Sequence, residues 1–304
     1  MIRKSFVSVV LVLLTCGVVA AQQHADPEFN TSVENPAYKK DGPRVMFDEA
    51  HHNFHTIDGR YKPFFDLLMN DGYRVVRNRQ PFGKTMLGSF KVLVIANALG
   101  AEEDDDEGAD TSAFTEEEIQ AVHDWVKGGG ALLLIADHAP FGGAAAALAS
   151  KFGVESSKGY TFDQKNSVDG TPSHLIFSRE NKLLGTHPIM EGRAESERIN
   201  IVRSFTGQSF KGPEDSTPIL KLSDTATDAP NANAQNHVSA AGRAQAVALK
   251  FGKGRVVVQG EAAMLSAQIA GAERRPMGMN VPGYDNKQYV LNLMRWLSGL
   301  LKEK

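Results

Sequence analysis

The sequence predicts one large α/β domain, and three observations carry that prediction. Apolar runs of strand length recur along the chain, separated by stretches with helical periodicity. Two of these runs, Lys91–Ala96 and Ala131–Ala136, are apolar throughout or nearly so, which is typical of parallel strands buried on both faces. The chain of 304 residues, 42% of them hydrophobic, is long enough for a single large core. We expect this ordered domain over residues 43–301.

The elements of the domain can be placed in order from periodicity and from start and stop signals. Helix starts are marked by capping residues, of which Thr115 with Glu118 three positions later is a capping box, and ends are marked by glycines. Residues 22–42 are polar and lack periodicity, which predicts a flexible tether. The expected strands are 44–47, 73–76, 91–96, 131–136, 246–251 and 255–259, and the expected helices are 61–70, 115–127, 144–152 and 286–301. Residues 156–241 have only short apolar runs and are expected to form an irregular insertion.

The first residues have the pattern of an export signal. Arg3 and Lys4 give a positive start, an apolar stretch too short to span a bilayer follows, and Val19–Ala21 supplies small residues for a signal peptidase. Residues 1–21 are therefore expected to be a signal peptide, and the protein is expected to be periplasmic or secreted. The alternative is a lipid anchor on Cys16, which would then become the N-terminus.

Composition excludes several classes of function. The chain has a single cysteine, and cleavage after residue 21 removes it, which excludes disulfides, thiolate nucleophiles and Cys-ligated zinc. The cleaved chain has a net charge of about −5 and no basic footprint, so nucleic acid is not an expected partner. No later apolar run is long enough for a transmembrane helix. The expected partner is a small-molecule or carbohydrate ligand.

Polar side chains gather where the predicted strands end. The segment 48–55 follows the strand Val45–Phe47 and places two carboxylates and three imidazoles within eight residues. Ligands of open α/β folds bind at the carboxyl ends of strands, so the residues at several strand ends are expected to face one crevice. These residues are Asp48, His51, His52, His55, Asn97, Asp137, His138 and Glu261. A nearby acidic run, Glu102–Glu107, lacks the spacing of an EF-hand and is expected to be a solvated loop.

Two functions are compatible with this set of residues. In the first, a divalent metal such as zinc is bound with His51 and His55 among its ligands, and the acidified water hydrolyses an ester, an amide or a glycosyl group. In the second, the same crevice is a non-catalytic binding module for a carbohydrate or cell-wall ligand. For the hydrolase we assign catalytic roles to Asp48, His138 and Glu261, and ligand binding to Asn97, Asp137 and His52.

The order of these motifs resembles a known superfamily. The first strand ends in Asp48, the run Gly128–Leu134 leads into a central strand, the strand Gly254–Val258 precedes Gly260-Glu261, and the chain closes with Asn286–Leu297. This arrangement resembles the class I glutamine amidotransferase-like superfamily, in particular a bacterial branch labelled a domain of unknown function, with ThuA-like proteins as more distant relatives.

The resemblance implies a fold and excludes the family's best-known activity. It implies a flavodoxin-like three-layer α/β/α sandwich with a mostly parallel central sheet and an irregular insertion. The family's enzymes place a cysteine at the turn after a central strand, whereas this chain has Asp137-His138 there and Gly260-Glu261 after the late strand. Without a cysteine to attack an amide, glutaminase activity is not expected.

Overall fold

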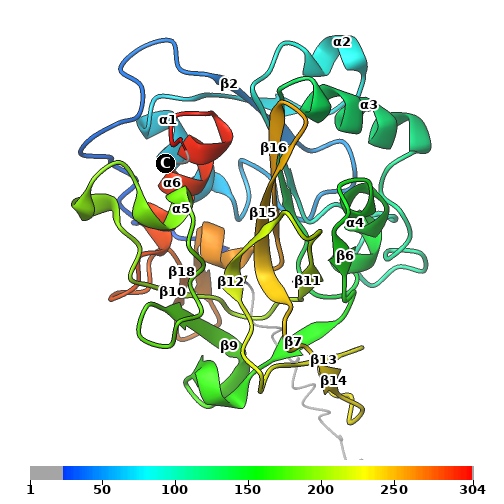
Figure 1. The fold of residues 1–304 in the computed structure, drawn as a ribbon, viewed down its shortest axis with the longest axis vertical. Coiled ribbons are helices and arrows are strands. Elements are labelled where there is room, and N and C mark those ends of the chain that lie inside the picture. The colour runs from blue at the N-terminus through cyan, green and yellow to red at the C-terminus, as the bar shows by residue number, and fades with distance from the viewer. Residues whose placement is uncertain (1–22, 303–304) are drawn as a thin grey trace, which may run out of the picture.

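The computed structural model describes residues 23–302 and has a large sheet between two groups of helices (Figure 1). The helices are α1 (Lys62–Asn70), α2 (Lys84–Leu87), α3 (Glu116–Lys127), α4 (Phe141–Ser150), α5 (Pro188–Glu191) and α6 (Asn286–Leu297), with 3-10 turns η1 (Gln164–Asn166), η2 (Glu195–Glu197) and η3 (Ala263–Leu265). The strands of the main sheet are β2 (Arg44–Asp48), β3 (Arg74–Asn78), β4 (Val92–Ala96), β5 (Ala131–Ile135), β6 (Glu155–Ser156), β11 (Phe210–Lys211), β12 (Thr217–Lys221), β15 (Ala244–Phe251) and β16 (Gly254–Gln259).

The main sheet is mixed. Its order is β3-β2-β4-β5-β16-β15-β11-β6, with β12 also paired to β15. The first five strands are mutually parallel and, counted along the chain, have the order 2-1-3-4-5. The pairs from β16 onward are antiparallel, because the tight turn between β15 and β16 forms a hairpin. The protein is therefore α/β with a large mixed sheet, and the expectation of a mostly parallel sheet holds only for one half of it.

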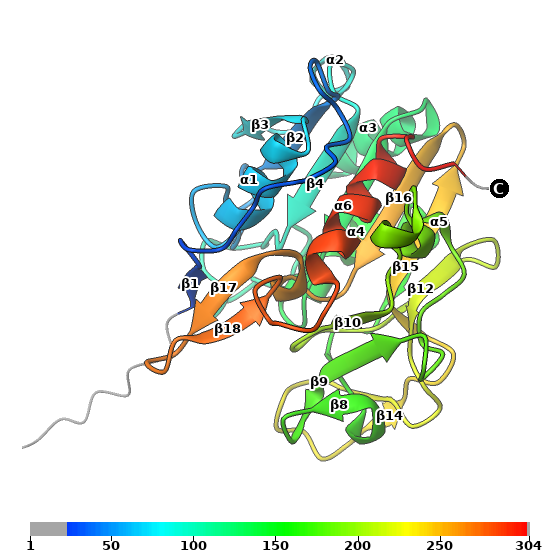
Figure 2. The same ribbon diagram turned by 90° about the vertical axis from the view of Figure 1, so that its left-hand side faces the viewer.

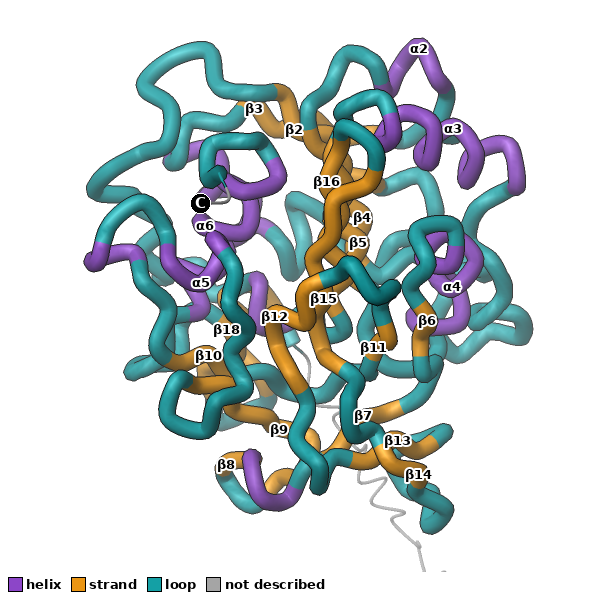
Figure 3. The backbone as a smooth tube through the Cα atoms, in the orientation of Figure 1, coloured by secondary structure: helices purple, strands orange, loops and turns teal. Residues whose placement is uncertain are grey.

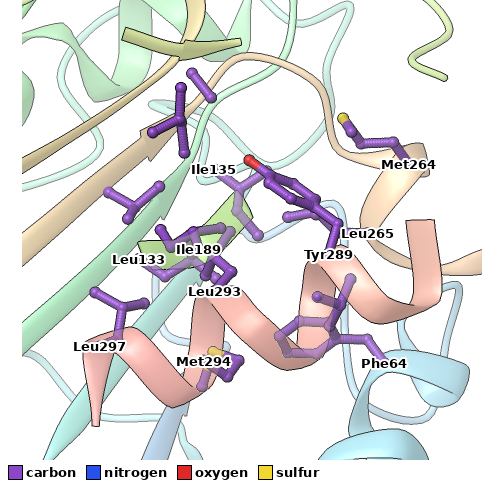
Figure 4. Close-up of a cluster of buried hydrophobic side chains, with 14 of the residues drawn as sticks. Phe64, Leu133, Ile135, Ile189, Met264, Leu265, Tyr289, Leu293, Met294 and Leu297 are labelled. Carbon is purple, nitrogen blue, oxygen red and sulfur yellow. The ribbon is translucent and has the colours of Figure 1, made fainter. Parts of the chain in front are cut away.

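Helices cover both faces of the parallel half because every second residue of a strand points to the same side. Val45 and Phe47 of β2 belong to one core with α1, α5 and α6, whereas Met46 belongs to another with α2, α3 and α4. Figure 4 shows the first core, where Leu293 and Leu297 of α6 approach the sheet. Burial on both faces is the reason that β4 and β5 are apolar at every position.

The capping signal at the start of α3 is confirmed. Thr115 and Glu118 form a complete capping box at the start of α3, with the side chain of each residue bonded to the backbone N–H of the other. The last helix begins at Asn286 as expected but ends at Leu297, four residues earlier than the sequence suggested. The helix after β5 begins at Phe141 and not at Ala144.

The insertion over residues 156–241 consists mostly of short strands and loops, drawn in orange and teal in Figure 3, with the short helix α5 and the turns η1 and η2 among them. Three of its strands, β6, β11 and β12, extend the main sheet. The others form two three-stranded sheets, β10-β9-β8 and β14-β13-β7. Their bounds are β7 (Tyr160–Phe162), β8 (Ser167–Val168), β9 (Thr171–Ser178), β10 (Ile201–Arg203), β13 (Thr227–Ala229) and β14 (Val238–Ser239).

The N-terminal segment is not a free tether over the part that the structure describes, residues 23–42. Its strand β1 (His24–Ala25) pairs with β17 (Ala267–Ala270), which pairs in turn with β18 (Arg275–Gly278). Further along, Tyr38 packs edge-on against Tyr73, and the backbone N–H of Ala37 donates to Asp71. The strand partner β17 comes from the far end of the chain, so the local sequence of this segment gives no sign of the pairing.

The expected signal peptide and Cys16 lie outside the described residues. Within residues 23–302, no helix is long and apolar enough to cross a membrane.

Candidate functional site

A cavity of about 340 Å³ lies at the carboxyl ends of four neighbouring parallel strands. The loops that follow β2, β4, β5 and β16 each contribute to its wall, as do Gln268 of β17 and Met277 of β18. Figure 2 shows the small sheet of β1, β17 and β18 near the end of β4. Its lining residues are Gln23, Phe54, His55, Arg60, Asn97, Asp104, Asp137, His138, Phe141, Thr206, Glu261, Ala263, Gln268 and Met277. Five of the eight residues expected at the site therefore line one cavity.

Two buried carboxyl groups, Asp137 and Glu261, face the cavity from β5 and β16. Asp137 is 8% exposed and Glu261 is 1% exposed. Backbone N–H groups hold both of them: His138 donates to Asp137 Oδ1 at 2.8 Å, and Ala263 and Met264 donate to separate oxygens of Glu261 at 2.8 Å each. The turn η3 thus presents its first N–H groups to Glu261, which fixes the orientation of this carboxyl group.

The carboxyl pair keeps a proton more readily than an isolated carboxyl group does. Burial raises the pKa of Glu261 well above its usual range, and the charge of Asp137 raises it further. Burial also raises the pKa of Asp137. Two neighbouring carboxylates in a poorly solvated space repel each other, so the pair holds its first proton more tightly than a lone carboxyl group would.

Asn97 positions the loop that carries Asp137. It follows β4 in the left-handed region, with φ of 51°, a conformation that asparagine tolerates better than most residues. Its Oδ1 accepts the backbone N–H of Asp137 at 3.0 Å, and its carbonyl oxygen accepts the N–H of Phe54 at 2.9 Å. Asn97 therefore ties the ends of β4 and β5 to the loop after β2.

His55 lines the cavity as a neutral imidazole. Burial, with the charge of Arg60, lowers its pKa to about 3. Its ring stacks on Tyr61 with centroids 4.6 Å apart, and its Nδ1 is buried without a hydrogen-bond partner among the described residues. A neutral imidazole nitrogen at a cavity wall can donate to or accept from a ligand, depending on its tautomer.

His138 lines the cavity on the other side of Asp137. Its ring stacks on Tyr160 with centroids 4.3 Å apart, and its Nδ1 lies 2.8 Å from the carbonyl oxygen of Ala139. That carbonyl can only accept, so Nδ1 carries the proton and Nε2 is the nitrogen left with a lone pair in the neutral ring. His138 is half-buried and accessible from the cavity.

Three of the expected site residues are not in the cavity. Asp48 is fully buried, and its Oδ2 lies 2.8 Å from His51 Nδ1. His51 Nε2 lies 2.8 Å from Glu118 Oε1, so both ring nitrogens of His51 bond to carboxylates. The pKa of His51 is raised: burial lowers it, but the bonds and charges of Asp48 and Glu118 outweigh that effect. His52, with φ of 46°, is exposed and outside the cavity.

Both ring nitrogens of His51, one of the two histidines expected to bind a metal, are bonded to carboxylates. His55 Nδ1 has no hydrogen-bond partner among the described residues. Of the three histidines of segment 48–55, however, His55 alone lines the cavity. Within residues 23–302, no group of three or more His, Cys, Asp or Glu side chains has an arrangement that could hold a metal ion.

Several lining residues escaped the sequence reasoning. Arg60 lies over the ring of Phe54, with its guanidinium carbon 4.4 Å from the centroid, and it donates to the backbone oxygen of Gln23. Asp104 comes from the acidic run that we expected to be a solvated loop, and it is indeed exposed. Gln268 comes from β17, a strand that the sequence pattern did not indicate. Of these residues, only Asp104 belongs to a segment that the sequence pattern had marked, and it was not assigned to the site.

Comparisons with known proteins identify the fold and no family. No family model matches the sequence, and a search of curated proteins finds no match. Among solved structures, the mmIFT52 N-terminal domain is similar with a TM-score of 0.60 at 12% identity, over 84% of this chain and 97% of that one. This likeness shows a shared fold.

ThuA-like proteins are also among the similar structures. One from Bacteroides uniformis has a TM-score of 0.46 at 12% identity, over 89% of this chain and 94% of that one. Another, from Parabacteroides merdae, has a TM-score of 0.45 at 12% identity, over 87% and 93%.

Proposed function

We propose that this protein is a hydrolase that uses the carboxyl pair Asp137 and Glu261 for general acid–base catalysis. The observation that carries the proposal is the burial of both groups at the wall of one cavity, with the pKa of each raised. A pair that holds one proton contains an acid and a base at the same time, and such pairs are typical of acid–base catalysis.

The chemistry is a transfer of water to a polar bond of the ligand. The ionised carboxylate removes a proton from a water molecule as its oxygen bonds to the electrophilic carbon. The protonated carboxyl group gives its proton to the leaving oxygen or nitrogen as that atom's bond to carbon breaks. The pair holds one proton before and after the step, and the elements of water are divided between the two products.

His138 and His55 complete the wall around the reacting bond. His138 Nε2 faces away from the Ala139 carbonyl that holds Nδ1, so it is available to a ligand. We assign it to ligand positioning or proton transfer, together with Asn97, which fixes the Asp137 loop. His55 remains neutral and offers one hydrogen bond. The catalytic role that we expected for Asp48 is not part of the proposal, because the cavity does not reach it.

A binding module for a carbohydrate or cell-wall ligand is the second candidate, and one observation favours it. Both oxygens of Glu261 already accept backbone N–H groups, as the acceptors of a structural cap do. If Glu261 serves only to cap η3, the cavity can hold a ligand without turning it over.

Turnover separates the two functions. Purified protein would be assayed with chromogenic esters, anilides and glycosides, beside the variants Asp137→Asn and Asp163→Asn. Asp163 is a matched control, since it is 2% exposed and hydrogen-bonded but does not line the cavity. We expect Asp137→Asn to lower kcat by about 100-fold or more and Asp163→Asn to leave it unchanged.

The pH dependence gives an independent readout. Because both pKa values of the pair are raised, activity should follow a bell-shaped profile whose optimum lies above the ordinary carboxyl range near 4. Wild-type turnover by Asp137→Asn would end the acid–base proposal. Binding without turnover in all three substrate classes would favour the binding module.

We also propose that the chain is an exported, amidotransferase-like protein with a flavodoxin-like core. The order 2-1-3-4-5 of its parallel strands is that of flavodoxin-like folds, in which ligands bind where the strand order reverses. Export rests on the N-terminal sequence pattern, and mass analysis of protein recovered from a secreting host would show whether cleavage follows Ala21.

A further inference from the structure

We propose that the ligand of this cavity is an extended peptide, held through the N–H and C=O of one of its residues by the side-chain amide of Gln268. The inference rests on the proposed function only in using the same cavity. It concerns which ligand the cavity recognises, whereas the proposed function concerns the reaction that the carboxyl pair catalyses.

Gln268 is a buried amide with nothing to bond to. It is fully buried on β17, and neither its Oε1 nor its Nε2 has a hydrogen-bond partner among the described residues. Its backbone is fixed by strand pairing on both sides, to Ala25 of β1 and Met277 of β18, and its carbonyl oxygen accepts from Asn280 at 2.9 Å. The side chain lines the cavity. A buried amide without hydrogen bonds costs free energy, and a ligand that bonds to it recovers that cost. The Gln268 amide is therefore a preorganised binding group at the cavity wall.

The unpaired groups at the wall are few, and they match a peptide better than a sugar. Besides Gln268, only His55 among the lining residues has a buried polar side-chain atom without a partner, its Nδ1. A sugar presents a hydroxyl on nearly every carbon and would need many such partners. An extended peptide residue presents one donor and one acceptor on the same side, as residues in a sheet do when they exchange both hydrogen bonds. A carboxamide offers the complementary acceptor and donor.

The rest of the wall suits an uncharged segment with apolar side chains. Phe54, Phe141, Ala263 and Met277 provide apolar surface. Burial lowers the pKa of Arg60, and the charge of Asp104, which also lines the wall, opposes that effect. These two charges largely offset each other, and the carboxyl pair would repel an anionic ligand. The cavity therefore favours backbone amides over carboxylates.

The test compares a peptide with its ester analogue. Wild-type protein would be titrated by NMR with N-acetyl trialanine amide and with the depsipeptide in which an ester oxygen replaces the central N–H. Loss of the donor should weaken binding by about tenfold, corresponding to one hydrogen bond in a buried site. Chitobiose and cellobiose form the sugar arm, and both should bind more weakly than the peptide. This comparison needs no variant and cannot be confused with misfolding.

A pair of matched variants assigns the effect to Gln268. Gln245 is also fully buried with both side-chain amide atoms unpaired, but it does not line the cavity. Gln268→Leu should lower affinity for the peptide by about 10- to 30-fold and abolish the preference for peptide over depsipeptide. Gln245→Leu should retain both the affinity and the preference.

The outcomes separate this inference from the proposed hydrolysis. Equal binding of peptide and depsipeptide to wild type, tighter binding of the sugars, or no binding of the peptide at millimolar concentration would each overturn peptide recognition. A preference for peptide in Asp137→Asn, with turnover unchanged, would leave recognition standing and end the acid–base proposal. Loss of turnover in Asp137→Asn, together with no preference for peptide over depsipeptide, would support the acid–base proposal and overturn peptide recognition.

Discussion

Replacement of His51 by phenylalanine is expected to destabilise the fold strongly, although His51 lies outside the cavity. The imidazole bonds at 2.8 Å to Asp48 on one side and to Glu118 on the other, and all three side chains are at most 8% exposed. Removal of the shared cation leaves two buried carboxylates without their partner. Breaking such an arrangement typically costs about 3–5 kcal/mol, which is a large part of the stability of most domains.

Phenylalanine isolates the electrostatic part of this cost. The His51 ring already packs against Phe82 and Phe114, with centroids at 4.6 and 4.8 Å, so an apolar ring of similar shape keeps those contacts. The neighbouring control is His52→Asn, because His52 is exposed and asparagine tolerates its positive φ. The control should change the free energy of unfolding by no more than about 0.5 kcal/mol.

The pH dependence of the free energy of unfolding shows whether the charge of His51 is responsible for the stabilisation. Because folding raises the pKa of His51, its contribution is fully present below the unfolded value of about 6.5 and is lost as the pH rises through the folded value. Burial raises the pKa of Glu118, but its bonds to His51 and to backbone N–H groups outweigh that effect, so folding lowers this pKa. Its contribution is present above the unfolded value of about 4.5 and is lost as the pH falls through the folded value.

Urea unfolding of wild type, His51→Phe and His52→Asn at a series of pH values from about 4 to 9 tests this reasoning. Wild type and control should lose stability as the pH rises above about 6.5, and His51→Phe should lack that loss while being less stable throughout. An unchanged urea midpoint in His51→Phe near pH 6, or the wild-type loss of stability at high pH in that variant, would refute the assignment.

Two further changes test the packing of the fold. Asp71→Asn removes the charge that pairs with the buried Arg295 at 2.7 and 3.0 Å. It should lower the free energy of unfolding by about 3 kcal/mol, the low end of the usual range, because Glu197 still contacts Arg295 at 3.0 Å. A urea midpoint equal to that of wild type would contradict this expectation. Thr115→Ala deletes the cap of α3 and should lower the free energy of unfolding by about 1 kcal/mol in the same measurement. Thr115→Ser keeps the hydroxyl and should retain most of the stability. Equal losses in the two variants would show that the hydroxyl is not the stabilising group.

The sequence predicted the strand ends of the site because those depend on local pattern and one general rule. Apolar runs located β4, β5 and β16, and the carboxyl-end rule then brought Asn97, Asp137 and Glu261 to one wall. His55 joined them because it follows β2. The rule works here because strands that are buried on both faces show plainly in sequence.

What the sequence could not give depends on contacts between distant positions. His51 looked like a ligand because its partner Glu118 is 67 residues away and was recognised only as a capping residue. The short strands β1, β17 and β18 have no pattern long enough to mark them in the sequence, so Gln268 could not be placed at the cavity. The β15–β16 hairpin was located by its two apolar runs. The short strands beyond it were missed, since β6 and β11 are two residues long and are held by their neighbours.

The route of the N-terminal segment affects how this protein should be handled. Gln23 is part of the cavity wall, and β1 is an outer strand of the sheet that carries Gln268. Shortening the chain to the recognisable domain at Pro43 would uncover β17, which would then offer unpaired backbone groups to other chains. An activity screen on such a shortened protein would examine an altered pocket. Tags and fusions are better placed after α6, and any trimming should stop before Gln23.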